Sequence, residues 1–208
     1  MNTTGSLSPD NAALLLIDHQ TGLMNGVADQ SQTDLRNNVL ALAKLGKMFE
    51  LPTVLTTSFV DGPNGPPMPE LTELFPEAPI IHRPGEINAW DNPEFVDAVK
   101  NTGRQKLLMA GISTDVCLAF AALSAKQDGF EVYAVLDASG TWNKDVAEAA
   151  KMRMVQAAII PINWMAVSAE LQNDWRNETG QGLADIYREH LPFYGNLMGS
   201  FAAASEKD

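Results

Sequence analysis

Six short apolar runs recur along the chain, each about as long as a buried strand. They cover residues 12–17, 53–58, 80–82, 106–110, 131–136 and 158–162. Most of these runs are continuous rather than alternating, which is typical of parallel strands that helices cover on both faces. The hydrophobic pattern therefore predicts a six-stranded, mostly parallel sheet.

Segments with helical periodicity lie between the apolar runs. They cover residues 32–50, 93–101, 115–128, 144–157, 164–177 and, more weakly, 181–190. Pro93 suits a first helical turn, and Gly129 stands just past a helix end. The alternation of strand and helix predicts a doubly wound α/β fold, a three-layer α/β/α sandwich with the common strand order 3-2-1-4-5-6.

Two stretches fall outside this alternation. Residues 61–70, DGPNGPPMPE, are dense in Pro and Gly, which predicts an ordered surface loop or flap, with a disordered linker as the alternative. Residues 179–208 predict a C-terminal helix and an apolar tail that packs on a neighbouring subunit. With 45% hydrophobic residues, we expect residues 1–208 to form a single domain around one core.

Charge and composition argue against several classes of function. The 14 Lys and Arg against 26 Asp and Glu give a net charge of −12, which disfavours nucleic acid and anionic membrane surfaces as partners. The first residues lack the features of a signal peptide, and no apolar run approaches a membrane span, so we expect a soluble cytoplasmic protein. A single cysteine, without a CxxC or HExxH motif, argues against a disulfide or a structural zinc, and we expect neither metal nor cofactor.

Asp18 and Cys117 are the first candidates for chemistry. In the predicted order the first and fourth strands are neighbours, and a ligand crevice is expected at their carboxyl ends, where Asp18 and Cys117 both fall. Each also has a structural alternative, a turn or helix cap for the carboxylate and a buried apolar role for the cysteine. With Ser113 or Thr114 as N-cap, however, Cys117 lies in a first helical turn, whose N–H groups lower a thiol pKa and can hold an oxyanion. This position predicts a nucleophile for acyl transfer.

A thiol nucleophile also needs a base. Among the three histidines, His190 lies in the weakly patterned C-terminal region, while His19 and His82 alternate with Asp18 and Arg83 and should point away from the crevice. Asp18 is then the best base. Arg83, unless it is only a solvated surface residue, could stabilise the thiolate and the oxyanion without shuttling protons.

Several stretches together resemble the isochorismatase-like cysteine hydrolases, most closely the YcaC branch. They are ALLLIDHQTGL, LPTVLTTS, RPGEINAWDN, LLMAGISTDVC, VLDASGTWN and DWRNETGQGLADIYREHLPFYGNLM, and the resemblance runs from about residue 10 to residue 202. It implies a catalytic triad of Asp18, Arg83 and Cys117. It further implies a cis peptide bond at Ile112–Ser113, which would aim the Ser113 and Cys117 amides at an oxyanion.

The chain departs from the family pattern in ways that narrow the expected activity. Most members have lysine in place of Arg83, so only electrostatic stabilisation is expected from this position. Nicotinamidases of the family hold a metal with an Asp and two His after the second strand, but TSFVDGPNGPP contains no histidine. Isochorismate hydrolases proper commonly lack the cysteine, so Cys117 points to the amidase-like members. The resemblance also implies a large homo-oligomer, an octamer of two stacked rings.

We therefore expect a cofactor-independent hydrolase of a small amide or related acyl compound, acting through a thioester. Asn88, Trp90, Phe59 and Trp142 are candidate pocket walls for a small, partly planar substrate, although large aromatic residues equally serve in cores. Two other functions fit the same fold. One is a redox or stress-linked protein in which Cys117 cycles through sulfenic acid, and the other is an inactive assembly protein.

Overall fold

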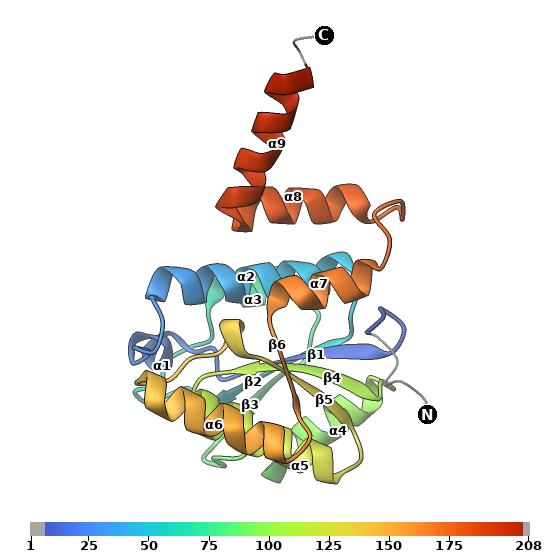
Figure 1. Cartoon of the computed structure of the whole chain (residues 1–208). Helices are drawn as coiled ribbons and strands as arrows, with labels where there is room; N and C mark the ends of the chain where they lie inside the picture. Colours follow the sequence, from blue (N-terminus) through green and yellow to red (C-terminus); the bar gives the residue numbers. More distant parts are fainter. Residues whose placement is uncertain (1–6, 206–208) are drawn as a thin grey trace.

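The computed structural model describes residues 7–205, which form a six-stranded sheet between layers of helices (Figure 1). The strands are β1 (Ala12–Ile17), β2 (Thr53–Ser58), β3 (Ile80–Arg83), β4 (Lys106–Gly111), β5 (Glu131–Val135) and β6 (Ile160–Ile162). All neighbouring strands pair in parallel, in the order β3-β2-β1-β4-β5-β6. The predicted sheet and its strand order are confirmed.

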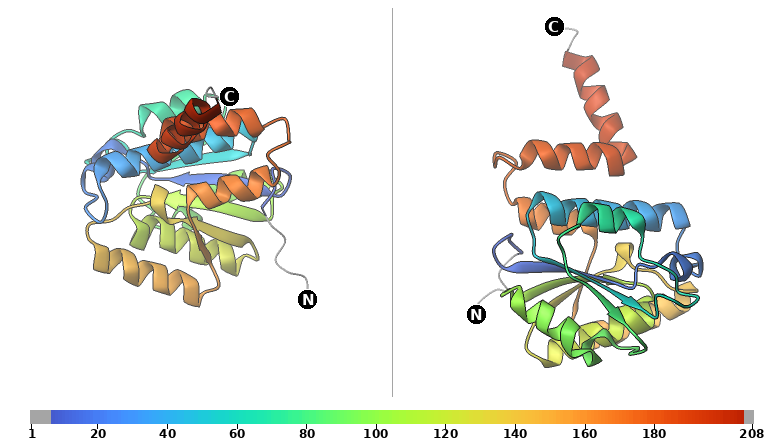
Figure 2. Two further views of the ribbon diagram at one scale, coloured as in Figure 1. Left: turned by 45° about the horizontal axis from the view of Figure 1, so that its top comes forward. Right: turned by 180° about the vertical axis from the view of Figure 1, so that it is seen from behind.

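Helices cover both faces of this sheet (Figures 1 and 2). One layer contains α2 (Gln32–Met48), α3 (Pro69–Leu74) and α7 (Trp164–Gln172), and the other contains α4 (Pro93–Asn101), α5 (Ala119–Gln127) and α6 (Lys144–Gln156). Short elements follow four of the strands: α1 (Thr21–Asn25), η1 (Ala89–Asp91), η2 (Thr114–Leu118) and η3 (Leu136–Ala138). The predicted three-layer α/β/α sandwich is confirmed.

Strand β1 shows why the apolar runs are continuous. Leu14 and Leu16 belong to the core under α2 and α7, whereas Ala13, Leu15 and Ile17 belong to the core under α4, α5 and α6. Both sets are fully buried, because each face of the strand meets a helical layer.

Three predicted segments differ from the structure in detail. The surface loop expected over residues 61–70 is ordered but ends early, because Pro69 begins helix α3 at a position where proline is well tolerated. The helix expected from residue 115 begins as the π-helical turn η2 before α5 takes over. The helix expected over 164–177 stops at Gln172, and Asn173 then adopts a left-handed φ of 55°.

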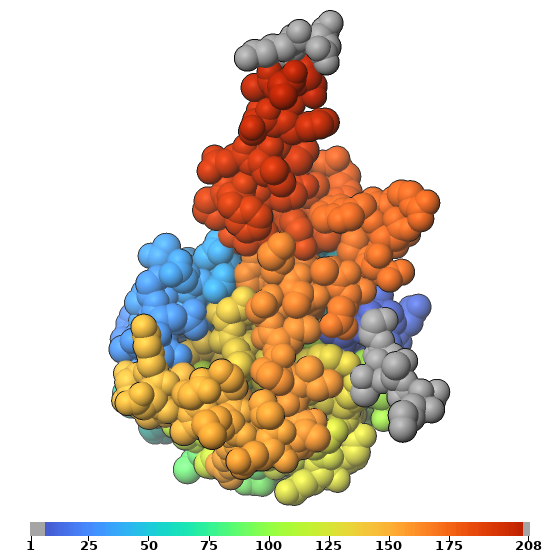
Figure 3. All heavy atoms as spheres, in the orientation of Figure 1, coloured from blue at the N-terminus to red at the C-terminus, as the bar shows by residue number. Residues whose placement is uncertain are grey.

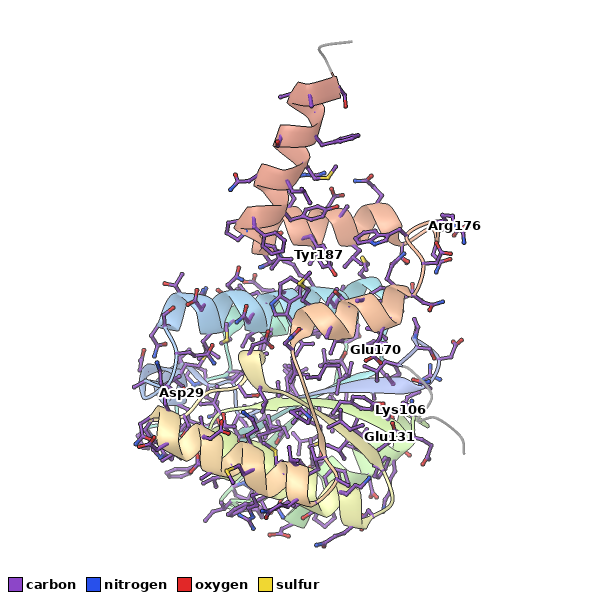
Figure 4. The ribbon with its side chains drawn as sticks, in the orientation of Figure 1. Asp29, Lys106, Glu131, Glu170, Arg176 and Tyr187 are labelled. Carbon is purple, nitrogen blue, oxygen red and sulfur yellow. The ribbon has the colours of Figure 1, made fainter. Side chains whose placement is uncertain are left out.

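The C-terminal region forms α8 (Gly180–His190) and α9 (Pro192–Ser205). Helix α8 is anchored by Tyr187, which lies below it in Figure 4 and hydrogen-bonds Ser168 of α7 with 2.6 Å between the hydroxyl oxygens. Helix α9 has no buried residue and rises from the body of the molecule (Figures 1 and 3). The last three residues of the predicted tail lie outside the described part of the chain. Within residues 7–205, no helix is long and apolar enough to cross a membrane.

Candidate active site

Asp18 lies where three strands end together. It follows β1 directly, and Ile17 is in register with Thr56 of β2 on one side and Gly111 of β4 on the other. Its φ of 57° is left-handed, a conformation that aspartate adopts more readily than most residues, and its backbone N–H donates to the Thr56 carbonyl at 2.9 Å. The side chain is fully buried between these strand ends.

Arg83, the last residue of β3, is held against Asp18 by a closed set of hydrogen bonds. Its Nη2 donates to both carboxylate oxygens of Asp18, at 2.5 and 2.6 Å. Its Nε donates to Thr56 Oγ1 at 3.0 Å, and its Nη1 donates to the carbonyls of Glu86 and Ile87. These five bonds match the five donors of a guanidinium, which is why the charge can be buried at 1% exposure.

Cys117 completes the predicted triad, but its thiol is not acidic. Burial raises its pKa, and the charge of Asp18 and a hydrogen bond between the two side chains raise the pKa further. The expectation that its helical position lowers the thiol pKa is therefore wrong, because these effects outweigh the nearby N–H groups and the Arg83 charge. Cys117 is therefore a neutral thiol at neutral pH.

The carboxylate of Asp18 is balanced between opposing effects. Burial raises its pKa above the ordinary value, while the charge and hydrogen bonds of Arg83, and then the hydrogen bond with Cys117, lower it. A base whose pKa is raised in this way accepts a proton more readily than an exposed aspartate does.

The turn that carries the predicted oxyanion donors is held by the segment that follows η3. The Ile112–Ser113 peptide bond is cis, as the family resemblance implied, and the Thr114 N–H donates to the Gly140 carbonyl at 3.0 Å. A backbone hydrogen bond from Ser113 lowers the pKa of Cys117, so this amide faces the sulfur. Ser113 stands at the N-cap position of η2, but its hydroxyl makes no capping bond.

Two of the predicted pocket residues stand at this edge of the sheet. Phe59 follows β2 with a φ of 46°, its N–H donates to the Arg83 carbonyl at 2.9 Å, and its side chain is 52% exposed. Trp142 is 50% exposed and follows Thr141, whose hydroxyl donates to Asp115 of η2 at 2.8 Å. Both remain candidates for contact with a substrate.

The other two predicted pocket residues have structural partners instead. Trp90 packs edge-on against Phe95 and Phe130, and its Nε1 donates to Asp128 at 2.9 Å. Asp128 follows the last turn of α5, about 16 Å along the helical axis from Cys117. These contacts give Trp90 a structural role near the far end of α5, and its place as a pocket wall stays a prediction.

Asn88 has a similar local role. Its Oδ1 accepts from the Trp90 N–H at 3.1 Å as the N-cap of η1, and its Nδ2 donates to Ser124 Oγ at 3.0 Å. Ser124 lies two helical turns beyond Cys117, about 10 Å away along α5. Asn88 thus ties η1 to α5, and its contact with a substrate stays a prediction.

None of the histidines joins the triad, as expected. His19 is buried and hydrogen-bonds the Ala138 carbonyl through Nε2 at 2.9 Å, and burial lowers its pKa to about 4. His82 is exposed and hydrogen-bonds Thr57, with 2.7 Å between Nδ1 and the hydroxyl oxygen. His190 pairs with Asn37 of α2.

Two residues that support the site were not found from the sequence. Thr56 is buried at 1% exposure and contacts the Arg83 Nε. Gln20 bridges the ends of β1 and β2, since its amide nitrogen donates to the carbonyls of Ser58 and Gly65 and its oxygen accepts from the Ser58 N–H. A run of threonines in a buried strand was the available signal for Thr56, because a buried hydroxyl needs a partner.

Within residues 7–205, no group of three His, Cys, Asp or Glu side chains is arranged to hold a metal ion. Asp29 lies toward the carboxyl end of the sheet, where it accepts from the Thr141 N–H at 2.9 Å, whereas Lys106 and Glu131 pair at the amino end (Figure 4). Asp29 thus supports the segment that precedes Trp142.

Comparison with known proteins agrees with this architecture. The isochorismatase domain model matches residues 12–166. The "Probable hydrolase YcaC" of Escherichia coli strain K12 is 52% identical over 195 residues, which is 94% of this chain and 93% of the relative.

Two solved structures match over nearly the whole chain. The Escherichia coli YcaC gene product, described as an octameric hydrolase of unknown specificity, has a TM-score of 0.95 and 50% identity, covering 98% of this chain and 100% of its own. YcaC from Pseudomonas aeruginosa, solved with hexane-2,5-diol and covalent acrylamide, has a TM-score of 0.94 and 53% identity, covering 97% and 100%. The chain therefore belongs to the isochorismatase family, in the YcaC branch of hydrolases.

Proposed function

We propose that this protein hydrolyses a small amide or related acyl compound through a thioester on Cys117. The observation that carries the proposal is that Cys117 lies beside a buried carboxylate, Asp18, whose charge raises the thiol pKa and whose two oxygens are both held by Arg83. A nucleophile next to a base that a third group orients is the common arrangement of covalent acyl-transfer sites.

The proposed reaction uses Asp18 twice. The Cys117 proton passes to Asp18 as sulfur attacks the carbonyl carbon, and the Ser113 and Cys117 amides hold the resulting oxyanion. The C–N bond then breaks, Asp18 returns the proton to the leaving amine, and a thioester remains. Asp18 next takes a proton from water, the hydroxide attacks the thioester, and the proton returns to the departing thiolate as the acid leaves.

A resting neutral thiol favours this function over redox signalling. Peroxide oxidises thiolates, and the raised pKa of Cys117 keeps the thiolate scarce until a substrate is attacked. The chain also has no second cysteine that could resolve a sulfenic acid.

The covalent acrylamide on the Pseudomonas aeruginosa relative supports a reactive nucleophile in this branch. Acrylamide is a small planar amide. The half-exposed rings of Phe59 and Trp142 could contact a planar group of that size in this chain.

The proposal is tested by screening small amides, carbamoyl compounds and nitriles for the release of ammonia or acid. Cys117→Ala should lower the rate on the best compound by about 10³-fold or more, and mass spectrometry of quenched wild-type protein should find an acyl adduct on Cys117. Equal hydrolysis by the wild type and Cys117→Ala would contradict the proposal.

We also infer that the protein self-associates, as the octameric Escherichia coli relative does. Helix α9 supports this inference, because it projects Phe193, Leu197, Met198 and Phe201 into solvent without burying any residue in its own chain. The C-terminal helix and tail would then form subunit contacts.

A further inference from the structure

We propose that Thr56 is a positioning residue whose hydroxyl fixes the orientation of the Arg83 guanidinium and, through it, the Asp18 carboxylate. The hydrogen bonds among Thr56, Arg83 and Asp18 support this positioning role by themselves. Its effect on turnover rests on the proposed hydrolase function.

The hydroxyl of Thr56 has one orientation available. Its proton is donated to the Ile81 carbonyl at 2.8 Å, and Thr56 and Ile81 are paired across β2 and β3. The oxygen is thereby left with its lone pairs as acceptor for the Arg83 Nε–H at 3.0 Å. Because the sheet fixes both β2 and β3, the Thr56 hydroxyl oxygen is held as firmly as the backbone.

Because the guanidinium is planar, the contact with Thr56 also fixes the direction of the hydrogen bonds from Arg83 to Asp18. Thr56 holds the Nε edge, the carbonyls of Glu86 and Ile87 hold Nη1, and the plane then directs Nη2 at both oxygens of Asp18. All five donors are used within the protein, so Arg83 has none left for a substrate. Arg83 is accordingly a positioning residue too, and Thr56 acts through it.

This set of hydrogen-bond acceptors suits the planar guanidinium of an arginine. A lysine ammonium is a point charge without a planar edge, so a hydroxyl beside its stem could not set the direction of its bond to Asp18. The Thr56–Arg83 contact therefore gives this chain a fixed base orientation that charge alone would not provide.

The neighbouring threonine offers a matched control. Thr57 is buried to the same 1% exposure, but its hydroxyl bonds His82, which is exposed and lies outside the triad. Thr56→Val and Thr57→Val thus remove the same group from adjacent buried positions, and only Thr56→Val leaves the Arg83 Nε without an acceptor. Thr56→Ser keeps the hydroxyl and should behave as the wild type.

The experiment is a titration of the Asp18 carboxyl group by ¹³C NMR of aspartate-labelled protein, with the signal assigned by its loss in Asp18→Asn. Arg83 lowers the pKa of Asp18, so a misdirected guanidinium in Thr56→Val should raise it by about one pH unit. Thr57→Val and Thr56→Ser should leave it unchanged. On an amide that the wild type hydrolyses, the acid limb of kcat/KM should move by the same amount, and kcat should fall while KM stays.

The outcomes separate this inference from the proposed function. An unchanged Asp18 titration in Thr56→Val, or an equal shift in Thr57→Val, overturns the role of Thr56 and leaves the hydrolase proposal intact. A shift confined to Thr56→Val in a protein that hydrolyses no amide supports the positioning role and rejects the hydrolase. Should Thr56→Val fail to fold, Thr56→Ala carries the same expectation.

Discussion

At the scale of single residues, the Asp18–Arg83 pair sets the character of the site. Burying both charges is costly, and the cost is offset only because every donor of the guanidinium and both oxygens of the carboxylate have partners. Removing one partner of such a pair typically destabilises a protein by about 3–5 kcal/mol. Variants at these positions must therefore be checked for folding before their activity is interpreted.

Asp18→Asn should separate the acidity of Cys117 from its catalytic use. The negative charge of Asp18 raises the pKa of Cys117, so its removal beside the remaining Arg83 should lower that pKa by about one unit or more. Iodoacetamide should then alkylate the variant at lower pH than the wild type, while hydrolysis is lost with the base. Asp29→Asn, near the same edge, should change neither property, because the asparagine oxygen can still accept the Thr141 N–H that holds the segment before Trp142. Alkylation of Asp18→Asn at unchanged or higher pH would refute this electrostatic account.

His19 should make the fold sensitive to acid. Its pKa is about 4 when folded and about 6.5 in an unfolded chain, so between these values only the unfolded chain takes up the proton. The free energy of unfolding should fall by about 3 kcal/mol as the pH drops from 6.5 to 4, and His19→Gln should lose this dependence. Urea denaturation at pH 7 and pH 4.5 measures it.

Asp137 has the opposite effect to that of His19 on stability at acid pH. Burial raises its pKa to about 6, so the folded chain binds that proton first as the pH falls, which stabilises the fold. The effect of His19 is therefore measured as the difference in pH dependence of the unfolding free energy between the wild type and His19→Gln. His82→Gln, at an exposed position, serves as control. Equal acid sensitivity in all three proteins would show that His19 is not the group responsible.

The candidate site could be predicted from the sequence only where the backbone determines it. Asp18 and Cys117 were found because parallel strands end at one edge, which the apolar pattern already indicates. The structural partners of Trp90 could not be predicted, because its position depends on contacts with Asp128 and Phe130, far along the chain. The acidity of Cys117 was misjudged because burial depth is a property of the packed molecule.

At the scale of elements, the strands were predicted to within two residues because burial on both faces demands continuous apolar runs. Helix α3 was missed because the prolines before it hide its start, and Pro69 is its first residue. The π-helical turn η2 has no sequence signature beyond ordinary helical periodicity.

Gln20 should control the order of the loop after β2. Its side chain makes three hydrogen bonds, to the Ser58 N–H and to the carbonyls of Ser58 and Gly65. Gln20→Leu removes all three, so limited proteolysis between residues 59 and 67 should become faster, and activity should fall with the loss of the Phe59 wall. Gln30→Leu removes a single bond, to the Ser139 carbonyl, and should leave cleavage in that loop unchanged. Equal protection of the loop in Gln20→Leu would rule out this role.

At the scale of the whole molecule, α9 stands apart from the body (Figure 3), and its Phe193, Leu197 and Phe201 side chains are exposed. Leu197→Ser combined with Phe201→Ser should reduce the molecular mass measured by light scattering after size exclusion, because an apolar contact between subunits is lost. Val155→Ser, at an exposed apolar position on α6, is the matched control. An unchanged mass in the double variant would show that α9 does not hold the subunits together.

All five N–H donors of Arg83 are used within the protein, and this affects how the product acid would leave the site. The acid formed from an amide is an anion at neutral pH, and anions are usually retained by a cation with free donors. Arg83 has none to offer, Asp18 repels the anion at close range, and the chain carries a net charge of −12. We therefore expect the neutral amide to enter more readily than its acid, and the acid to inhibit weakly when added as product.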